Sequence, residues 1–239
     1  MAGIFKEWTV LPHGKLTRLE DNLVTVVGEL PMPLGDFPRR MTVARLQDGR
    51  LVIFSAIALD EPEMQELEAW GRPAYLVVPN ERHRKDVLIW KTRYPDLIVV
   101  APPGARDNVA EVVPVNETAA DFGDPSVVFV VVPGTDQRES ALVVRSPGGT
   151  TLVANEIIWN VDDRPGFGGW LFHLIGFTGH EPKIPRLVAA KSIQDRPALR
   201  AQLERWAEIP DLNRIVVSHG AIISDGARVI LRDLASNLD

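Results

Sequence analysis

The stretch at residues 77–90, VVPNERHRKDVLIW, changes from an apolar run to a charged cluster and back to an apolar run. The run before Asn80 is typical of a buried strand, and the run after Asp86 has the apolar spacing of a helix. Strands that end in polar residues and return through a helix are the building units of layered α/β folds, in which ligands gather at the ends of strands. The charged cluster is therefore a candidate site.

The first half of the chain extends this unit in both directions. We expect a hairpin, a helix, a strand and a second helix over residues 41–46 with 51–55, 60–71, 75–79 and 82–94. The dipeptide Asp48-Gly49 is a strong hairpin-turn signal. Asp60 has the position of a helix N-cap, with Pro62 in the first turn.

The second half repeats the same order of elements. We expect strands and helices over residues 126–135, 141–155, 195–209, 212–220 and 229–238. The strand of the first half ends at Pro79-Asn80, and its counterpart ends at Ser218-His219. This repetition predicts two pseudo-symmetric halves, with both polar pairs at one edge of the molecule.

Residues 162–182 interrupt the pattern with a glycine-rich and aromatic segment. This segment is interpreted as an irregular insertion, either a lid over a pocket or a subunit contact. A packed loop with one short helix is the alternative reading.

Composition limits the classes of function. The 239 residues carry a formal net charge of -6, which argues against nucleic acid as a partner, and the absence of cysteine excludes disulfides and thiolate metal sites. No apolar run is long enough for a membrane span, and no signal peptide is recognisable. We expect a single cytoplasmic domain, 1–239, with a small-molecule ligand; a homodimer and a monomer are the alternatives for its assembly.

The order of these motifs resembles the metallo-β-lactamase superfamily. The stretches PRRMTVARLQDGRLVIFSAIAL, VVPNERHRKDVLIWKTRYPDLIVVAPPG and LVANEIIWNV are similar to an uncharacterised bacterial branch of that superfamily with a degenerate metal-binding motif. The resemblance covers about residues 23–238. It implies an α/β fold, an αββα four-layer sandwich of two halves.

The resemblance also indicates where metal ligands would lie. Metal-binding members carry His-x-His-x-Asp-His after a first-half strand, and here residues 80–86 leave only His83 and Asp86 as plausible ligands. The last histidine of the family matches His219. The bridging aspartate corresponds to Asn155, whose neutral amide is a poor ligand for a hard cation.

Two further family positions have also changed. Gly134 lies in a stretch that resembles the Gly-His-Thr motif without its histidine, and Ser55 stands where an aspartate often closes a strand. These losses argue against an intact two-metal centre.

The residues themselves leave the role of His83 open. In a helix over 82–94, His83 and Asp86 would share one face and could bind a metal together with His219. Alternatively, His83 is a core histidine that is hydrogen-bonded to Asp86 or to the backbone. Arg82 and its basic neighbours can contact an anionic substrate or form a solvated face.

Two hypotheses follow. The first is a hydrolase with at most one zinc, iron or manganese ion held by His83, Asp86 and His219, in which Asp86 and His219 are the catalytic residues. The second is a metal-free pseudoenzyme that binds a small molecule or a partner.

Overall fold

The computed structural model describes residues 3–31, 36–174 and 176–238. Ten strands form two sheets within these residues. The first sheet has the order β1-β2-β3-β4-β5-β6, with bounds Thr17–Glu20, Leu23–Leu30, Phe37–Arg45, Arg50–Phe54, Arg72–Val77 and Ile98–Val100. Strands β1 to β4 are antiparallel, whereas β5 runs parallel to β4 and to β6.

The second sheet has the order β10-β9-β8-β7. Its strands, in chain order, are Val127–Val131, Ser140–Ser146, Gly149–Ala154 and Leu212–Val217. Strands β7, β8 and β9 are antiparallel, and β10 is parallel to β9. Each sheet thus combines a hairpin with a parallel strand that returns through a helix, which is the repetition predicted from the sequence.

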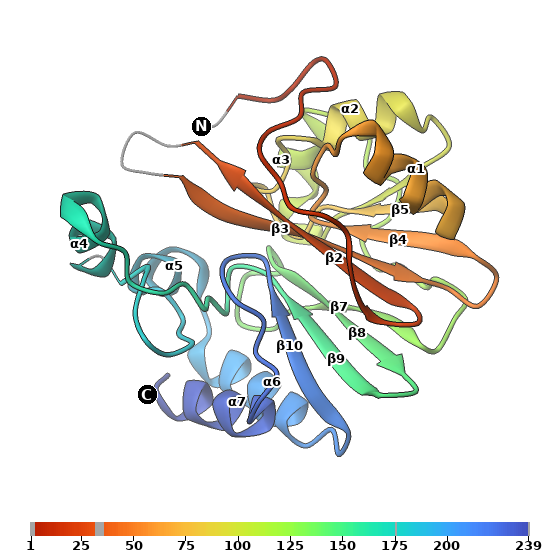
Figure 1. Ribbon diagram of the computed structural model, residues 1–239. Helices are drawn as coiled ribbons and strands as arrows, with labels where there is room; N and C mark the ends of the chain where they lie inside the picture. The colour runs from red at the N-terminus through yellow and green to blue at the C-terminus, as the bar shows by residue number, and fades with distance from the viewer. Residues whose placement is uncertain (1–2, 32–35, 175, 239) are drawn as a thin grey trace.

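Helices cover the outer face of each sheet (Figure 1). In chain order, the helices α1 to α7 are Glu61–Trp70, Val87–Arg93, Arg106–Ala110, Gly166–Leu174, Arg186–Ser192, Arg196–Ala207 and Ala227–Ser236. A short 3-10 helix, η1, spans Pro103–Ala105 directly before α3. Helices α1 and α2 lie over the first sheet, and α6 and α7 lie over the second (Figure 1). No helix of the described residues is long and apolar enough to cross a membrane.

The three largest apolar clusters of the described residues hold these layers together. One packs the outer face of the first sheet against its helices around Trp90, and another packs the second sheet against α6 and α7 around Trp206. A third lies between the sheets, where Phe54 and Val77 meet Leu142 and Val216. The layer order is therefore helix, sheet, sheet, helix, and the predicted αββα sandwich is confirmed.

Local signals placed several elements correctly. Asp48 and Gly49 form the turn between β3 and β4, where Gly49 has a φ of 84°. Asp195 caps α6, because its side chain accepts a hydrogen bond from the Ala198 amide. Asp60 is the N-cap residue of α1, although its side chain makes no capping hydrogen bond there.

One predicted element begins later than expected. A helix over 82–94 was predicted, but α2 spans only Val87–Arg93, and the preceding residues form turns. The Asn80 side chain accepts a hydrogen bond from the Arg82 amide, which favours a turn over a helix there. His83 and Asp86 consequently do not share a helical face.

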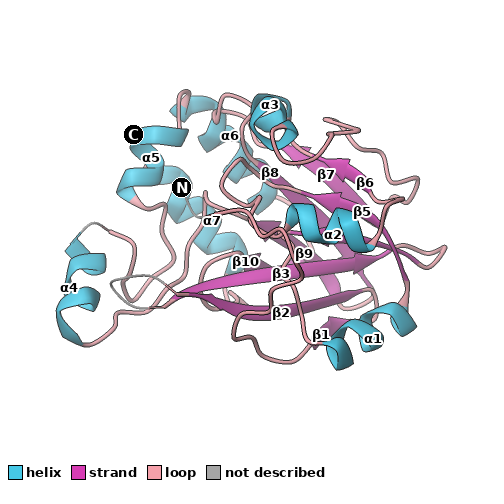
Figure 2. Ribbon diagram, turned by 90° about the horizontal axis from the view of Figure 1, so that it is seen from above, coloured by secondary structure: helices cyan, strands magenta, loops and turns pink. Residues whose placement is uncertain are grey.

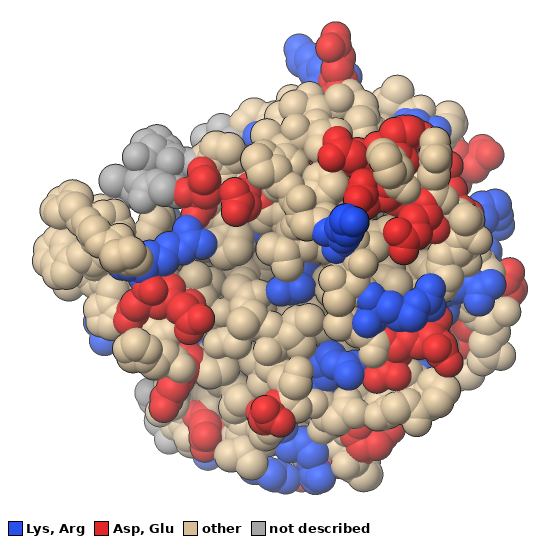
Figure 3. Space-filling view, viewed as in Figure 1, with Lys and Arg blue, Asp and Glu red and all other residues tan. Residues whose placement is uncertain are grey.

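The insertion at residues 162–182 contains one short helix, α4, which projects from the body of the molecule (Figures 1 and 2). Phe172 is buried on its inner face, whereas Phe167 and Trp170 are 73% and 57% exposed. Lys, Arg, Asp and Glu side chains are interspersed over the face in Figure 3, but α4 contains none of these four residue types. Its roles as a lid or a subunit contact stay predictions.

Candidate metal centre

Four polar residues follow the ends of four strands at one edge of the sandwich. Ser55 follows β4, His83 lies in the loop after β5, Glu156 follows β9, and His219 follows β10. Because β4 runs parallel to β5, and β9 to β10, each pair of strands ends at the same edge of its sheet. The two polar strand ends predicted from the sequence thus meet at one place.

His83, Glu156 and His219 form a compact cluster. The Oε1 atom of Glu156 lies 3.2 Å from Nε2 of His83 and 3.6 Å from Nε2 of His219. One ligand atom from each of the three residues lies within 4.8 Å of the others. A tetrahedral ion with bonds of about 2.0–2.2 Å needs ligand atoms roughly 3.3–3.6 Å apart, so the cluster fits a single metal ion after a small contraction.

The second nitrogen of each imidazole is held in place. The His219 Nδ1 atom lies 2.8 Å from the Pro38 carbonyl oxygen, which accepts only, so Nδ1 donates there and Nε2 is the nitrogen that faces Glu156. The His83 Nδ1 atom lies 2.8 Å from the Ser55 hydroxyl. Such outer contacts orient metal-binding histidines and select their tautomer.

The electrostatics favour the ligand forms of these groups. Burial lowers the pKa of His83, and the Glu156 carboxylate offsets only part of that effect. Burial by itself would raise the pKa of Glu156, but the bonds to His219 and His83 outweigh it and hold this pKa well below its usual range. A neutral imidazole beside an ionised carboxylate is the state that a divalent cation binds.

A second buried carboxyl group, that of Glu139, contacts the backbone of Glu156. Glu139 is 2% exposed, and its two oxygens accept hydrogen bonds from the Asn80 side chain and from the Glu156 amide. Burial, followed by the negative charge of Glu156, raises the pKa of Glu139 to about 8. The opposite shifts of the two pKa values concentrate the negative charge of the pair on Glu156.

Of the residues proposed from the sequence, the structure brings His83 and His219 together but places Asp86 elsewhere. The two imidazole ring centres lie 5.3 Å apart. Asp86 is 1% exposed and pairs with the Arg39 guanidinium, and its other oxygen accepts a hydrogen bond from the Ala58 amide at 3.0 Å. Both carboxylate oxygens are thus occupied outside the cluster. The separation follows from the late start of α2.

Sequence reasoning missed Glu156. The resemblance matched the neighbouring Asn155 to the bridging aspartate of the family, and Glu156 is the next residue in the chain. Asn155 is fully buried, and its contact with Glu139 is too loose for a hydrogen bond, so neither amide atom has a partner within the described residues. A carboxylate directly beside a matched ligand position was the available signal.

The other altered family positions have structural roles. The Gly134 backbone has a φ of 83°, and its carbonyl accepts hydrogen bonds from the Gln194 and Asp195 amides at the start of α6. Ser55 holds His83, as described above. Neither residue supplies a carboxylate or imidazole that would support a second metal ion.

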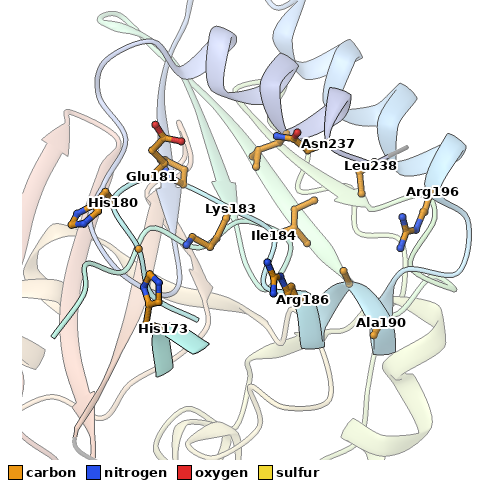
Figure 4. A pocket seen from close by; sticks show the side chains of 14 residues that line it. His173, His180, Glu181, Lys183, Ile184, Arg186, Ala190, Arg196, Asn237 and Leu238 are labelled. Atoms are coloured by element: carbon orange, nitrogen blue, oxygen red, sulfur yellow. The ribbon is translucent and has the colours of Figure 1, made fainter. Parts of the chain in front are cut away.

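Two surface cavities are formed by the described residues. One, of about 290 Å³, is lined by Asn80, Arg82 and Glu139 and adjoins the cluster. The other, of about 720 Å³, lies between the α4–α5 segment and the end of α7. Figure 4 shows Lys183 and Arg186 on one side of the larger cavity, opposite the C-terminal residues of the described chain.

Comparison with known proteins identifies the fold. No protein-family model and no curated protein match the chain. The metallo-β-lactamase FIM-1 from Pseudomonas aeruginosa, solved in its mono-zinc form, is similar in structure with a TM-score of 0.63 and 12% identity, over 95% of this chain and 96% of that one. A metallo-β-lactamase from Hirschia baltica has a TM-score of 0.61 and 14% identity, over 95% and 98% of the two chains.

A third structure, a metallo-β-lactamase from Erythrobacter litoralis, has a TM-score of 0.62 and 15% identity, over 93% of this chain and 96% of that one. The similarity extends over nearly the whole length of each chain. This protein therefore has the metallo-β-lactamase fold, as the sequence motifs indicated.

Proposed function

We propose that this protein is a hydrolase that uses one metal ion held by His83, Glu156 and His219. The observation that carries the proposal is the convergence of these three ligand groups within 4.8 Å at the shared edge of the two sheets. The mono-zinc form of FIM-1 shows that a protein of this fold can hold one ion. Glu156 takes the ligand role that the sequence suggested for Asp86.

The donor set suits a borderline divalent cation. Two imidazoles and one carboxylate with an open fourth position are typical of catalytic zinc sites, and zinc, iron and manganese all accept such ligands. When bound, such an ion polarises the bond to be cut and lowers the pKa of a bound water to about 7.

The chain's own residues perform the remaining tasks. Pro38 and Ser55 fix the two imidazole rings, so that little reorganisation is needed on binding. Glu156 supplies the only charge among the three proposed ligands. Glu156 and His219 are buried and His83 is partly buried, which limits contact with bulk water and strengthens each electrostatic contact.

Metal analysis tests the proposal directly. The purified protein is loaded with zinc, iron or manganese, dialysed and analysed for its metal content. We expect one ion per chain in the wild type and background levels in His83→Ala and Glu156→Gln. His173→Ala is the control, because His173 lies on the exposed α4 helix, and it should retain the metal.

Circular dichroism of each variant separates loss of the ligand from loss of the fold. A wild-type protein that retains none of the three metals in stoichiometric amounts would refute the proposal. A panel of ester, phosphodiester and lactam substrates then tests hydrolysis by the loaded protein.

A metal-free binding protein is the second candidate. It is favoured by the neutral amides of Asn80 and Asn155, which stand at positions that the resemblance assigns to metal ligands, and by the contact of His83 with Glu156, which is satisfied without an ion. In that case the double variant His83→Ala/His219→Ala would retain ligand binding. Loss of a measured hydrolysis in this variant, with the fold intact, would exclude the candidate.

A further inference from the structure

A small polar cavity lies near the cluster formed by His83, Glu156 and His219. Its volume is about 290 Å³, near the low end for ligand sites, which usually measure roughly 300–1,000 Å³. Arg82 lies between the cavity and the cluster, with its Nη1 atom 3.6 Å from Oε2 of Glu156. Glu139 lines the cavity and accepts a hydrogen bond from the Glu156 amide. Arg82 and Glu139 therefore connect the cavity with Glu156, although none of the three proposed ligands lines the cavity itself.

Three basic side chains line this cavity: Arg82, Arg138 and Lys191. Arg138 lies 3.9 Å from Glu81 and 3.6 Å from Asp136, so two acidic groups offset its charge. Lys191 makes no side-chain hydrogen bond or ion pair in the part of the chain that the structure describes, and it is exposed. Its charge is left uncompensated.

Among the described residues, the positive charge of Arg82 is compensated only by Glu156. Its Nη2 atom donates to the Ser192 hydroxyl at 3.0 Å, and its single ion pair among the described residues is the contact with Glu156. A divalent cation bound to Glu156 would neutralise the carboxylate charge that otherwise pairs with Arg82. Arg82 and Lys191 would then both present uncompensated positive charge to the cavity.

We infer that this cavity binds the anionic group, a carboxylate or a phosphate, of a small polar molecule, and that Arg82 and Lys191 determine this specificity. That the molecule is the substrate rests on the proposed function. Guanidinium and ammonium groups are the usual partners of such anions, because their hydrogen bonds are charge-assisted.

Titration of the metal-free protein with inorganic phosphate and with acetate tests the inference. Amide chemical shifts in NMR spectra report both the affinity and the location. We expect saturable binding of at least one anion, with shifts concentrated at residues 80–82, 135–139 and 191–194. The anion that binds more tightly identifies the preferred group.

Matched variants separate a site from general attraction to basic residues. Lys191→Gln and Arg82→Gln should weaken the affinity by at least about fivefold, since each removes a charged hydrogen-bond donor. Lys15→Gln and Arg72→Gln are the controls, because these exposed residues lie outside the cavity. The inference is wrong if neither anion binds saturably, or if the cavity variants bind as tightly as the controls.

The variant Glu156→Gln should strengthen anion binding, whereas the cavity variants should weaken it. It removes the negative charge that a metal would neutralise, so it should bind the anion more tightly than the metal-free wild type. Adding Arg82→Gln should remove this gain. Unchanged or weaker binding by Glu156→Gln would overturn the assigned role of Arg82.

Metal content measured on portions of the same preparations, loaded with metal and then dialysed, separates the two proposals. If the wild type retains no metal but binds the anion in this cavity, the proposed function fails and the anion site remains. If it retains one ion per chain but binds neither anion, the inference fails and the metal proposal remains. Lys191→Gln should hold as much metal as the wild type.

Discussion

Ser55 combines an unusual backbone conformation with a contact to His83, one of the three proposed metal ligands. Its φ is 58°, in the left-handed region that disfavours residues with a side chain, and its hydroxyl lies 2.8 Å from Nδ1 of His83. Strain of this kind persists where the surroundings enforce it, and it is common at functional sites. We infer that Ser55 is kept for its hydroxyl.

Substitution of Ser55 separates the hydroxyl from the backbone strain. Ser55→Ala and Ser55→Gly should both lower metal affinity by roughly 10- to 100-fold, as is usual when a partner of a metal ligand is removed. Glycine also relieves the strain, so Ser55→Gly should be about 1 kcal/mol more stable than Ser55→Ala.

Competition with a chromogenic zinc chelator measures the affinity, and urea unfolding measures the stability. Ser236→Ala is the control, since Ser236 lies exposed at the end of α7. Equal metal affinity in all variants would show that the hydroxyl does not support His83.

Asp86 has a structural role at the residue scale. Burial raises its pKa, and the Arg39 guanidinium opposes this effect. Arg39 has two further nitrogen atoms, Nε and Nη2, that are buried without a hydrogen-bond partner within the described residues. Asp86 therefore supplies the main compensation for a buried positive charge.

We expect Asp86→Asn to lower the free energy of unfolding by about 3–5 kcal/mol, because it leaves the Arg39 charge buried and unpaired. The folded fraction should still hold as much metal as the wild type. Urea unfolding and metal analysis check the two parts. A stable Asp86→Asn protein that lost its metal would restore Asp86 as a ligand.

At the scale of elements, one carboxylate joins the two sheets. Asp124 lies before β7 and accepts hydrogen bonds from the Ser126 amide and hydroxyl, at 2.8 and 2.7 Å. It also accepts one from the Gln47 amide, in the turn after β3, at 2.7 Å. This side chain ties the β3–β4 turn to the start of β7.

The Asp124 contacts predict a stability loss in acid. Burial alone would raise the pKa of Asp124, but the hydrogen bonds from Gln47 and Ser126 outweigh it and the net pKa is lowered. In acid the unfolded chain binds this proton before the folded chain does. The stability that Asp124 contributes is therefore present above about pH 3.9, the usual aspartate pKa, and is lost as the pH falls below it.

We expect Asp124→Asn to cost about 1–3 kcal/mol at pH 6 and distinctly less at pH 3. Urea unfolding at both pH values measures this. Asp121→Asn serves as the control, because Asp121 is exposed and bonds only the nearby Gly123 amide among the described residues. A cost for Asp124→Asn that does not change with pH would contradict the assignment.

At the scale of the whole molecule, the core between the sheets is shared by the two halves. Phe54 and Val77 from the first sheet pack with Leu142 and Val216 from the second. Arg40 on β3 adds hydrogen bonds to carbonyls in the segment around His219. Such contacts join the two halves, and the single domain 1–239 stays a prediction.

We therefore expect one cooperative unfolding transition. Circular dichroism and tryptophan fluorescence should give the same urea midpoint, because Trp90 and Trp206 report on the outer cores of the two halves. Leu142→Ala should lower the stability by about 2–5 kcal/mol and keep the transitions coincident. Separate midpoints would show that the halves unfold independently.

The predicted homodimer also belongs to this scale. The α4 helix exposes Phe167 and Trp170, whose rings stack with centres 5.7 Å apart. If α4 is the subunit contact, sedimentation should show a wild-type dimer and a monomeric Phe167→Ser/Trp170→Ser variant of similar stability, since both side chains are exposed in the monomer. A monomeric wild type would remove this interpretation.

The sequence by itself determined the order of the elements and the edge at which the site lies. Apolar periodicity, the Asp48-Gly49 turn and the Asp60 cap position are local signals, so they can be recognised within a few residues. His83 and His219 were identified because each follows a predicted strand and because the family resemblance matches its metal-binding motifs at these positions.

Only the tertiary structure decided which carboxylate joins those histidines. Asp86 was preferred as the carboxylate ligand because it follows His83 closely in the sequence. In the structure, turns precede α2, which begins only at Val87, and the Asp86 carboxylate forms an ion pair with Arg39. Glu156 lies 73 residues from His83 in the chain and reaches it through the packing of one sheet on the other. Local patterns do not encode such contacts, because they depend on how distant strand ends meet once the cores have formed.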